Sequence, residues 1–561
     1  MGFDYDVLII GSGFGGSVTA LRAAEKGYKV GILEAGKQYT AKDFAKTSWD
    51  LRKYLYAPGL GCRGIQRITP LKDVFILSGA GVGGGSLVYS NTLYEPMDPF
   101  FNDKIWAHVT DWKSELAPFY KKARAMLGVD KVPKLTPADK IMLELAKRLG
   151  VEDTFKPTDV GVFFGEPGKA VNDPFFDGAG PERSGCVGCG GCMVGCRHNA
   201  KNSLDKNYLY FAQKLGAKIH PETKAIDVIP LDSGGYAVVT QRPGAWVNKR
   251  KKVFTAEKVV FSAGVLGTLK LLFKLKETGR LPKISDKLGD TVRTNSEAIV
   301  GATADEVPAE DLTKGVAISS SIYPDEVTHI EPCRYSKGSN SISLLTTMMV
   351  DGGEGESRRK KFLKQVIANP KEFIMSFSKK RWSERSVILL VMQTKDNSMR
   401  IIRKRGYLTS TRGHGEPNPS YLPVANNSAR VVADIIKGKA WGSWGEALFD
   451  APTTAHIIGG ACIGNSPEEG VVDPFHRIFG YEGLCVADGS VIGANLGVNP
   501  SLTITTMSER AMSFWPNKNE TDLRPKLGTP YQKIAPVQPI NPAVAESVIE
   551  SIPIKLAAKQ H

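Results

Sequence analysis

Val7-Leu8-Ile9-Ile10-Gly11-Ser12-Gly13-Phe14-Gly15-Gly16 is the stretch that decides the fold of this 561-residue chain. Four apolar residues, typical of a buried parallel strand, run directly into a G-x-G-x-x-G turn. A helix is expected over residues 17–24, and a second apolar strand, residues 29–33, ends at Glu34. The order strand, glycine turn, helix, strand predicts an α/β fold built on a parallel sheet.

This unit has the spacing of a dinucleotide site. Gly11 makes the tight turn, Gly13 lets backbone approach a pyrophosphate, and Gly16 lets the helix pack closely on the strand. The phosphates would lie at the positive end of the helix, and Glu34 would accept hydrogen bonds from ribose hydroxyls. The unit alone does not distinguish one dinucleotide from another.

Composition and charge exclude some function classes. The chain is 42% hydrophobic and 23% charged, as expected for a globular protein with a sizeable core. Its net charge of +15 would suit nucleic acid or an anionic membrane surface. Because there is no zinc-finger repeat, basic arm or helix-turn-helix pattern, we expect no nucleic-acid partner.

The densest basic stretch is residues 358–361, which an apolar-rich segment follows up to a second basic run at 379–381. One interpretation is a solvated surface pair of helices broken at Pro370. The other is peripheral contact with a membrane surface, from which a lipophilic substrate is drawn.

The sequence predicts no membrane span and no secretory signal. Residues 74–94 and 489–508 are uncharged but rich in Gly, Ser, Thr and Asn, so neither suits a lipid-facing helix. Four of the eight cysteines fall within eleven residues, which is not the scatter of a disulfide framework and favours a reducing compartment. We expect a cytoplasmic or peripherally membrane-associated protein.

Three further segments also have a glycine-rich turn after a short apolar run that is expected to form a strand. They are residues 79–91, residues 258–267, and residues 484–490 together with the Gly497–Pro500 turn and a helix-like run over 501–512. Glycine allows backbone to lie against a flat ligand, and exposed amides can meet phosphate or ring oxygens.

These motifs resemble the glucose–methanol–choline (GMC) oxidoreductase family, in its cholesterol oxidase-like branch. The resemblance runs from the N-terminus to about residue 515 and is best at residues 81–86, 456–460, 487–490 and 497–500. It implies a bacterial enzyme that binds FAD without a covalent link. The residues implied to contact FAD, from the adenosine end to the ring, are Gly11, Gly13, Gly16, Glu34, Asp488, Gly489, Gly85, Tyr89, Asn91 and Asn499.

The resemblance also implies the chemistry. His456 matches the family's active-site histidine and Asn499 its asparagine partner. Histidine suits removal of a hydroxyl proton, while flavin accepts the hydride. The expected substrate is a sterol or a similarly bulky apolar alcohol; the alternatives are another hydrophobic alcohol or a sugar, or a mainly electron-transferring flavoprotein. Glu331 is a candidate for the carboxylate with which enzymes of this branch isomerise a sterol double bond.

A cysteine run stands apart from these motifs. Cys186, Cys189, Cys192 and Cys196 have the C-x2-C-x2-C-x3-C spacing of bacterial ferredoxins, with Arg197 where that pattern carries proline. The spacing favours a [4Fe–4S] or [3Fe–4S] cluster, over a zinc site or a metal-free reduced loop. With a cluster, the electron acceptor would be a protein or a quinone; without one, it would be O2.

The expected architecture has a discontinuous Rossmann-like FAD-binding domain, residues 1–100, 197–300 and 450–515. Residues 101–196 and 301–449 would form a second, α+β substrate domain on an antiparallel sheet, with the cysteine loop at 186–196 and a strand over 386–392. The remaining residues, 516–561, form a proline-rich tail expected to be extended.

Overall fold

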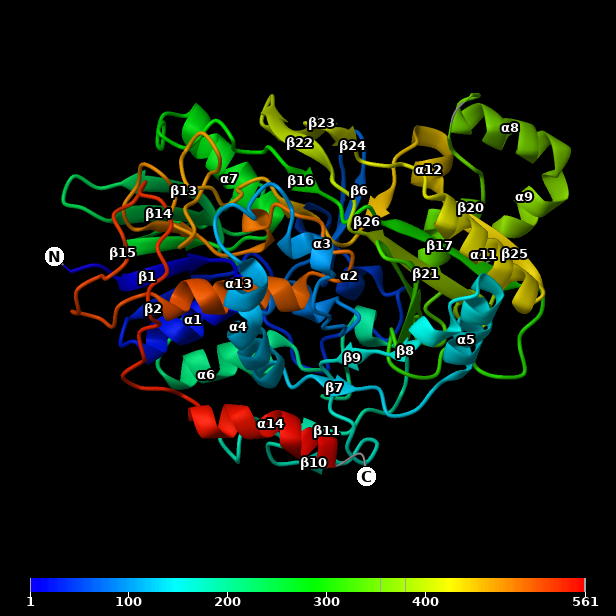
Figure 1. Cartoon of the computed structure of the whole chain (residues 1–561), viewed down its shortest axis with the longest axis horizontal. Helices are drawn as coiled ribbons and strands as arrows, with labels where there is room; N and C mark the ends of the chain where they lie inside the picture. The colour runs from blue at the N-terminus through cyan, green and yellow to red at the C-terminus, as the bar shows by residue number, and fades with distance from the viewer. Residues whose placement is uncertain (1, 354, 379, 559–561) are drawn as a thin grey trace.

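The first sheet is parallel at its centre and lies on the left of Figure 1. The computed structural model describes residues 2–353, 355–378 and 380–558. The parallel strands, in spatial order, are β12 (Lys218–His220), β2 (Val30–Leu33), β1 (Tyr5–Ile10), β15 (Lys252–Phe261) and β28 (Leu484–Val486). This confirms the Rossmann-like architecture, because the glycine turn follows the central strand.

The sequence-predicted helices pack against this sheet. α1 (Phe14–Glu25) is buried along its whole length, and α13 (Ser501–Ser513) packs beside it. A buried ion pair joins them: the Arg22 guanidinium donates to both oxygens of Glu509, at 2.7 and 2.8 Å. α7 (Val265–Glu277) follows β15, and the antiparallel strands β13 (Lys224–Pro230) and β14 (Tyr236–Gln241) extend the sheet on the other side of β15.

The second sheet is antiparallel and lies on the right of Figure 1. Its order is β20 (Thr346–Met348), β25 (Gly438–Ser443), β17 (Ala298–Ala304), β21 (Ser386–Gln393), β19 (Thr328–Cys333), β18 (Ser320–Asp325) and β8 (Lys156–Pro157). The strand predicted over 386–392 is therefore central to this sheet. The two sheets together confirm the predicted fold class.

Alternation along β21 gives this sheet two different faces. Val387, Leu389 and Val391 pack in one core with α5 (Pro137–Leu149) and α11 (Pro423–Ile435). The intervening residues Ile388, Leu390 and Met392 belong to a separate apolar cluster on the other face. Because successive strand residues point to opposite faces, the register of β21 decides which side chains face away from the helices.

The basic and apolar segment forms the predicted pair of helices. α8 (Arg358–Ala368) ends before Pro370, where α9 (Pro370–Ser376) begins. The pair packs on α12 (Trp444–Phe449) through Phe362 and Phe373, whose rings lie 5.9 and 6.2 Å from the Trp444 ring. In the described part of the chain, no helix has the length and apolarity needed to cross a membrane.

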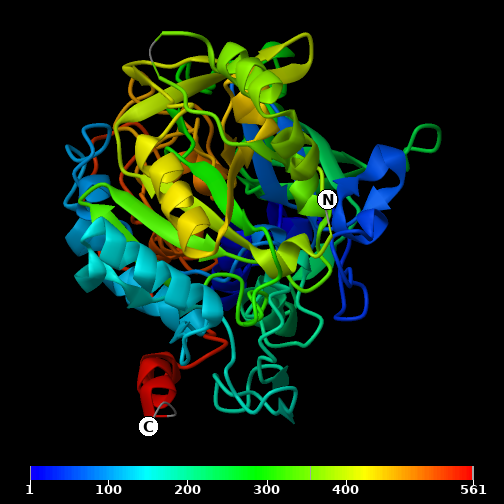
Figure 2. The ribbon, with the colours of Figure 1, turned by 90° about the vertical axis from the view of Figure 1, so that its right-hand side faces the viewer.

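The proline-rich tail follows the surface of the first domain. Residues 516–545 contain no helix or strand, as expected of an extended chain, and the tail then ends in α14 (Glu546–Ala558). The amide of Asn541 donates to the Glu25 carbonyl at 3.0 Å, and Lys26 Nζ donates to the Val537 carbonyl at 3.0 Å. Figure 2 shows α14 in red at the lower edge of the molecule. The proline content did not predict this helix.

Candidate functional site

The first glycine turn is shaped by close backbone contacts. A Cβ atom at Gly11, whose φ is +109°, would lie 2.1 Å from the Ser262 carbonyl oxygen, and one at Gly16 would lie 2.2 Å from the Gly11 oxygen. Both positions therefore exclude every other residue. Gly13 differs, because a Cβ there would meet no atom within 4 Å. It precedes α1, whose first turn carries no acidic side chain, so the helix N-terminus is open to an anion.

Glu34 lies at the end of β2, beside this turn. Its Oε2 accepts hydrogen bonds from the Ser12 amide at 3.1 Å and the Ser12 hydroxyl at 2.7 Å, and Oε1 accepts from the Gly36 amide at 2.8 Å. The Ser12 hydroxyl also accepts from the Gly83 amide at 3.1 Å, so Glu34 and Ser12 connect the two glycine loops.

The second glycine loop lies directly on the first. A Cβ at Gly84 would be 2.7 Å from Gly13 Cα, and one at Gly85 would be 3.4 Å from the Phe14 ring. The Tyr89 ring meets the Phe14 ring edge-on at 5.6 Å. Residues 84–89 thus cover the start of α1, as the prediction for Gly85 and Tyr89 requires.

Asn91 carries an observation that points to a ligand. It is fully buried with φ +72°. Its side chain lies close enough to the Cys192 thiol to oppose the rise in that thiol's pKa, and neither amide atom forms a hydrogen bond of ordinary geometry within the described chain. Buried polar atoms are almost always satisfied, so a bound group is expected beside them. This side chain and the open space at Gly13 fit FAD.

Asp488 lies just past the carboxyl end of β28, at the same sheet edge as the first glycine turn. It accepts hydrogen bonds from the Thr268 hydroxyl at 2.5 Å and from the Ser490 amide and hydroxyl at 2.9 and 2.6 Å. Burial raises its pKa. Gly489 follows it, packed toward Ile504 and Ile458. Ligands of such sheets bind at this edge, and the geometry places Asp488 and Gly489 at the same edge as Gly11, Gly13 and Gly16.

His456 and Asn499 form a second cluster. His456 follows β26 (Thr453–Thr454), Asn499 lies just before α13, and Asn499 Nδ2 is 3.2 Å from His456 Nε2. The opposite ring nitrogen, Nδ1, lies 3.0 Å from Oε2 of Glu297. The sequence does not point to Glu297, which precedes β17 with no motif around it. Only a strand predicted to begin at this residue would have placed it on the face of the sheet near His456.

Two further buried groups on β19 lie at this cluster. His329 and Glu331 are fully buried, with Nδ1 and Oε1 3.6 Å apart, beyond hydrogen-bond distance. Burial raises the pKa of Glu331 well above its ordinary value, and Asn499 is close enough to oppose that shift. Burial also lowers the pKa of His329 to about 3. The His329 ring packs between Tyr94 and Tyr323, at 4.9 and 4.7 Å.

Away from this polar end, the same face of the sheet is apolar. The register pairs Glu331 with Leu390, and Leu390 with Ile299. Ile388, Leu390 and Trp441 pack in one cluster with the partly buried Ile299 and with Met193 of the cysteine loop. The face is therefore polar at one end and apolar over the rest of its length.

The cysteine loop, residues 186–196, lies beside the second glycine loop. Lys201 Nζ, which is buried, donates to the carbonyls of Leu87, Tyr89 and Cys192 at 3.1, 2.8 and 3.0 Å. Burial raises the pKa of the Cys186 thiol to about 12. Among the described residues, no group of three or more His, Cys, Asp or Glu side chains is arranged to hold a metal ion. The iron–sulfur cluster therefore stays a prediction.

Comparisons with known proteins agree with the fold and the cofactor. The GMC oxidoreductase family profile matches residues 180–276 and 408–508, and an FAD-binding domain profile matches residues 6–52. The chain is 55% identical over 556 residues to a cholesterol oxidase of Mycobacterium tuberculosis, covering 96% of both chains. It is 46% identical to a cholesterol oxidase of Acinetobacter baumannii, covering 92% of this chain and 95% of that one.

Solved structures show the same fold at low identity. Pyridoxine 4-oxidase from "Mesorbium loti" aligns with a TM-score of 0.58 and 13% identity, over 90% of this chain and 98% of that chain. The chain is an FAD-dependent oxidoreductase acting on CH–OH groups. It belongs to the GMC oxidoreductase family, in the cholesterol oxidase-like branch.

Proposed function

We propose that the protein oxidises the hydroxyl group of a sterol, or of a similarly bulky apolar secondary alcohol, to a ketone. The observation that carries this proposal is one face of the second sheet, which is apolar at Leu390, Ile388 and Trp441 and polar at Glu331. His456 and Asn499 lie together at that polar end. Two relatives that cover nearly the whole chain are named cholesterol oxidases, which supports the same substrate class.

Two residues of the chain would act on the hydroxyl group of the substrate. His456 Nε2 takes the hydroxyl proton, and the Asn499 amide donates a hydrogen bond to the substrate oxygen. FAD, when bound, supplies the two-electron oxidant for the hydride. The apolar face excludes water and holds the carbinol carbon in one orientation.

We propose O2 as the electron acceptor, reduced by two electrons and two protons to hydrogen peroxide. The names of the relatives support this choice.

A second candidate route for the electrons passes through the cysteine loop, because Lys201 and Arg183 are buried beside it and neither forms a salt bridge in the described chain. Burial lowers the pKa of Lys201 to about 8, and the nearby Cys192 and Cys196 oppose that shift. Thiolates or an anionic cluster would compensate these cations.

Glu331 supports a second reaction, isomerisation of the sterol double bond. A carboxyl group that takes an allylic proton and returns it at the far end of the double bond works best with a pKa raised toward neutrality. Burial of Glu331 beside Asn499 raises its pKa in that direction.

We also propose that α8 and α9 contact a lipid surface from which the substrate is drawn. Exposed apolar side chains on this pair alternate with basic ones: Ile367 and Ile374 are 79% and 70% exposed, and Lys360, Lys364 and Lys371 are exposed too. The pair lies at the upper right of Figure 1 and projects from the body. Apolar and cationic side chains on one helix face suit an anionic bilayer.

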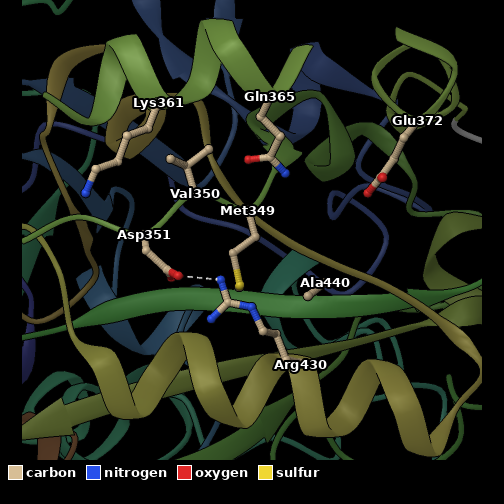
Figure 3. Close-up of a pocket in the computed structure, with 8 residues that line it drawn as sticks. All are labelled: Met349, Val350, Asp351, Lys361, Gln365, Glu372, Arg430 and Ala440. Atoms are coloured by element: carbon tan, nitrogen blue, oxygen red, sulfur yellow. Dashed lines mark hydrogen bonds and ion pairs between the residues drawn. The ribbon is translucent and has the colours of Figure 1, made fainter. Parts of the chain in front are cut away.

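A cavity of about 360 Å³ separates these helices from α11. Figure 3 shows Lys361 and Gln365 of α8 on one side and Arg430 of α11 on the other, paired with Asp351 at 2.7 Å. The helices are anchored to the body by a small apolar cluster in which Phe362 and Phe373 meet β20 and α12. The buried Arg358 adds hydrogen bonds to the carbonyls of Val350 and Ser420, at 3.0 and 2.7 Å.

The proposed function is tested by mixing the FAD-loaded protein anaerobically with cholesterol in detergent micelles and following the visible absorbance of the flavin. Bleaching, with a conjugated or unconjugated 3-ketosteroid as product, supports the proposal. No bleaching by cholesterol or by an apolar 3-hydroxysteroid would reject it. Adding air afterwards tests the acceptor, since an oxidase recovers its absorbance and releases one hydrogen peroxide per ketone. Iron and sulfide analysis of anaerobically purified protein tests the cluster.

A further inference from the structure

The Glu297 carboxylate is held through one of its two oxygens, while Oε1 is buried with no hydrogen-bond partner in the described chain. Its Oε2 accepts hydrogen bonds from the Thr454 hydroxyl at 2.7 Å and the Ala455 amide at 3.0 Å, and lies 3.0 Å from His456 Nδ1. The side chain is fully buried, and no salt bridge with lysine or arginine involves it in the described chain. An acidic side chain buried without a cation is costly unless hydrogen bonds or a titratable partner compensate it.

The backbone before Glu297 is strained. Asn295 and Ser296 both have left-handed φ, +60° and +43°, which residues with a side chain rarely adopt. Such strain persists only where surrounding contacts impose it. Here, the Asn295 side chain donates to the Val498 carbonyl at 2.8 Å and accepts from the Gly497 amide at 2.8 Å. The turn that places Glu297 is thus bonded to the loop that carries Asn499.

We infer that Glu297 is the positioning residue for His456, a role that rests on the proposed alcohol oxidation. Oε2 of Glu297 faces the amide N–H of Ala455, so it is an acceptor, and His456 Nδ1 must donate to it. The proton of the neutral imidazole is then on Nδ1, and the Nε2 lone pair points to Asn499 and the substrate side. Carboxylate–imidazole pairs of this kind fix both tautomer and ring orientation.

The step balances with the groups named. The hydroxyl proton of the substrate moves to His456 Nε2, and the O–H electron pair forms the carbonyl. FAD, held at the glycine turns, would supply the two-electron oxidant that accepts the hydride of the carbinol carbon. His456 becomes an imidazolium, whose positive charge the Glu297 carboxylate stabilises at 3.0 Å. Glu297 does not touch the substrate. Its loss should therefore change proton transfer more than substrate binding.

The experiment uses the FAD-loaded protein, cholesterol in detergent micelles and stopped-flow flavin reduction across a pH series. In Glu297→Gln we expect at least a tenfold lower limiting rate, an unchanged dependence on cholesterol concentration, and an ascending pH limb moved to lower pH, because the imidazolium loses its anion. Glu297→Asp should recover part of the rate only if a shorter carboxylate still reaches Nδ1. Glu446→Gln is the matched control, since Glu446 is equally buried but caps α12. Its pH limb should not move.

The measurements distinguish failure of the positioning role from failure of the proposed function. If cholesterol reduces the wild-type flavin and Glu297→Gln retains the wild-type rate and pH limb, the positioning role is rejected while the proposed function stands. If cholesterol does not reduce the wild-type flavin, the proposed function fails. The inference is then decided by nitrogen NMR of ¹⁵N-histidine-labelled protein, with His456→Gln assigning the signal. A proton on Nδ1 that depends on Glu297 supports it, and a proton on Nε2 in the wild type overturns it.

Discussion

Asn499 Nδ2 lies 3.2 Å from His456 Nε2, although the two residues are 43 positions apart. The contact joins the segment after β26 to the turn before α13, and it defines where the substrate oxygen would be held. A substrate hydroxyl placed here would meet a proton acceptor and a hydrogen-bond donor at once.

His456→Ala is expected to lower the rate of flavin reduction by cholesterol about 10²–10⁴-fold, because a general base contributes that much. FAD should stay bound, since the hydrogen bonds of His456 in the described chain run to Thr454, Glu297 and Asn499 and not to the glycine turns. The flavin spectrum of the purified variant checks cofactor content, and unchanged turnover would remove His456 from the mechanism.

Asn499→Ala should lower the rate of flavin reduction by cholesterol about 10²-fold, which is the typical cost of losing one hydrogen-bond donor to a reacting oxygen.

Glu331→Gln is expected to separate oxidation from isomerisation. The variant should still form the ketone but should accumulate the unconjugated product, which chromatography with ultraviolet detection distinguishes. Because burial raises the folded-state pKa of Glu331, the wild type loses stability as pH rises toward that pKa. Glu331→Gln does not titrate, so its thermal midpoint relative to the wild type should rise with pH. Equal conjugated product from both proteins would exclude Glu331 as the isomerisation carboxylate.

Gly13→Ala and Gly16→Ala should fail in different ways. Space is open at Gly13, so its alanine variant should fold and bind FAD weakly, because the methyl group occupies the approach to the pyrophosphate. At Gly16 the methyl group would clash with the Gly11 carbonyl, at an expected cost of about 1–3 kcal/mol or more. Thermal unfolding and FAD content of both variants are the measurements. A Gly13→Ala protein with full FAD affinity would contradict the placement of the phosphates.

Glu509→Gln should destabilise the protein by about 1–3 kcal/mol at neutral pH, because it removes one of the two carboxylates that pair with the buried Arg22 guanidinium, and Glu25 remains as the other. Burial alone would raise the pKa of Glu509, but Arg22 outweighs it and the pKa is lowered. The stabilisation is therefore present above the unfolded-state pKa of about 4.3 and is lost as pH falls through the folded-state value. Urea unfolding should show the two proteins converging below about pH 4.

The exposed pair Lys113–Asp98, 2.6 Å apart with both side chains more than half exposed, provides the control for that comparison. Lys113→Gln should change stability by less than about 1 kcal/mol at any pH. A Glu509→Gln variant as mild as this control would show that the α1–α13 ion pair contributes little.

Replacing Lys360, Lys364 and Lys371 of the α8–α9 pair with glutamate should abolish binding to phosphatidylserine vesicles. Each lysine near an anionic surface contributes about 1 kcal/mol, so removing three should weaken binding at least ~100-fold. Vesicle cosedimentation measures this, and activity on micellar cholesterol should persist. Trp246→Ser is the matched control, since Trp246 is also 79% exposed but lies on the β14–β15 loop. If only Trp246→Ser loses binding, the membrane contact belongs to that loop.

Much of the fold could be predicted from the local pattern of apolar residues, glycines and prolines in the sequence. β1, α1 and β2 were predicted within a few residues, because strand, turn and helix signals all lie within the first forty residues. The break at Pro370 was predicted because proline cannot continue a helix. α14 was not predicted: its segment follows a run of prolines and its pattern is weak. Domain boundaries and the cysteine cluster remain predictions, because spacing does not fix how thiols point.

The sequence by itself determined the dinucleotide unit and the family, because both are carried by motifs of residues close together in the chain; His456 and Asn499 were then implied by the resemblance to that family. Only the tertiary structure decided which groups act on His456. Glu297 lies 159 positions before it, at a strained turn bonded to the Asn499 loop, and Glu331 reaches the same place from β19. Such contacts depend on strand register across the second sheet, where a shift of one residue would turn Glu331 to the other face.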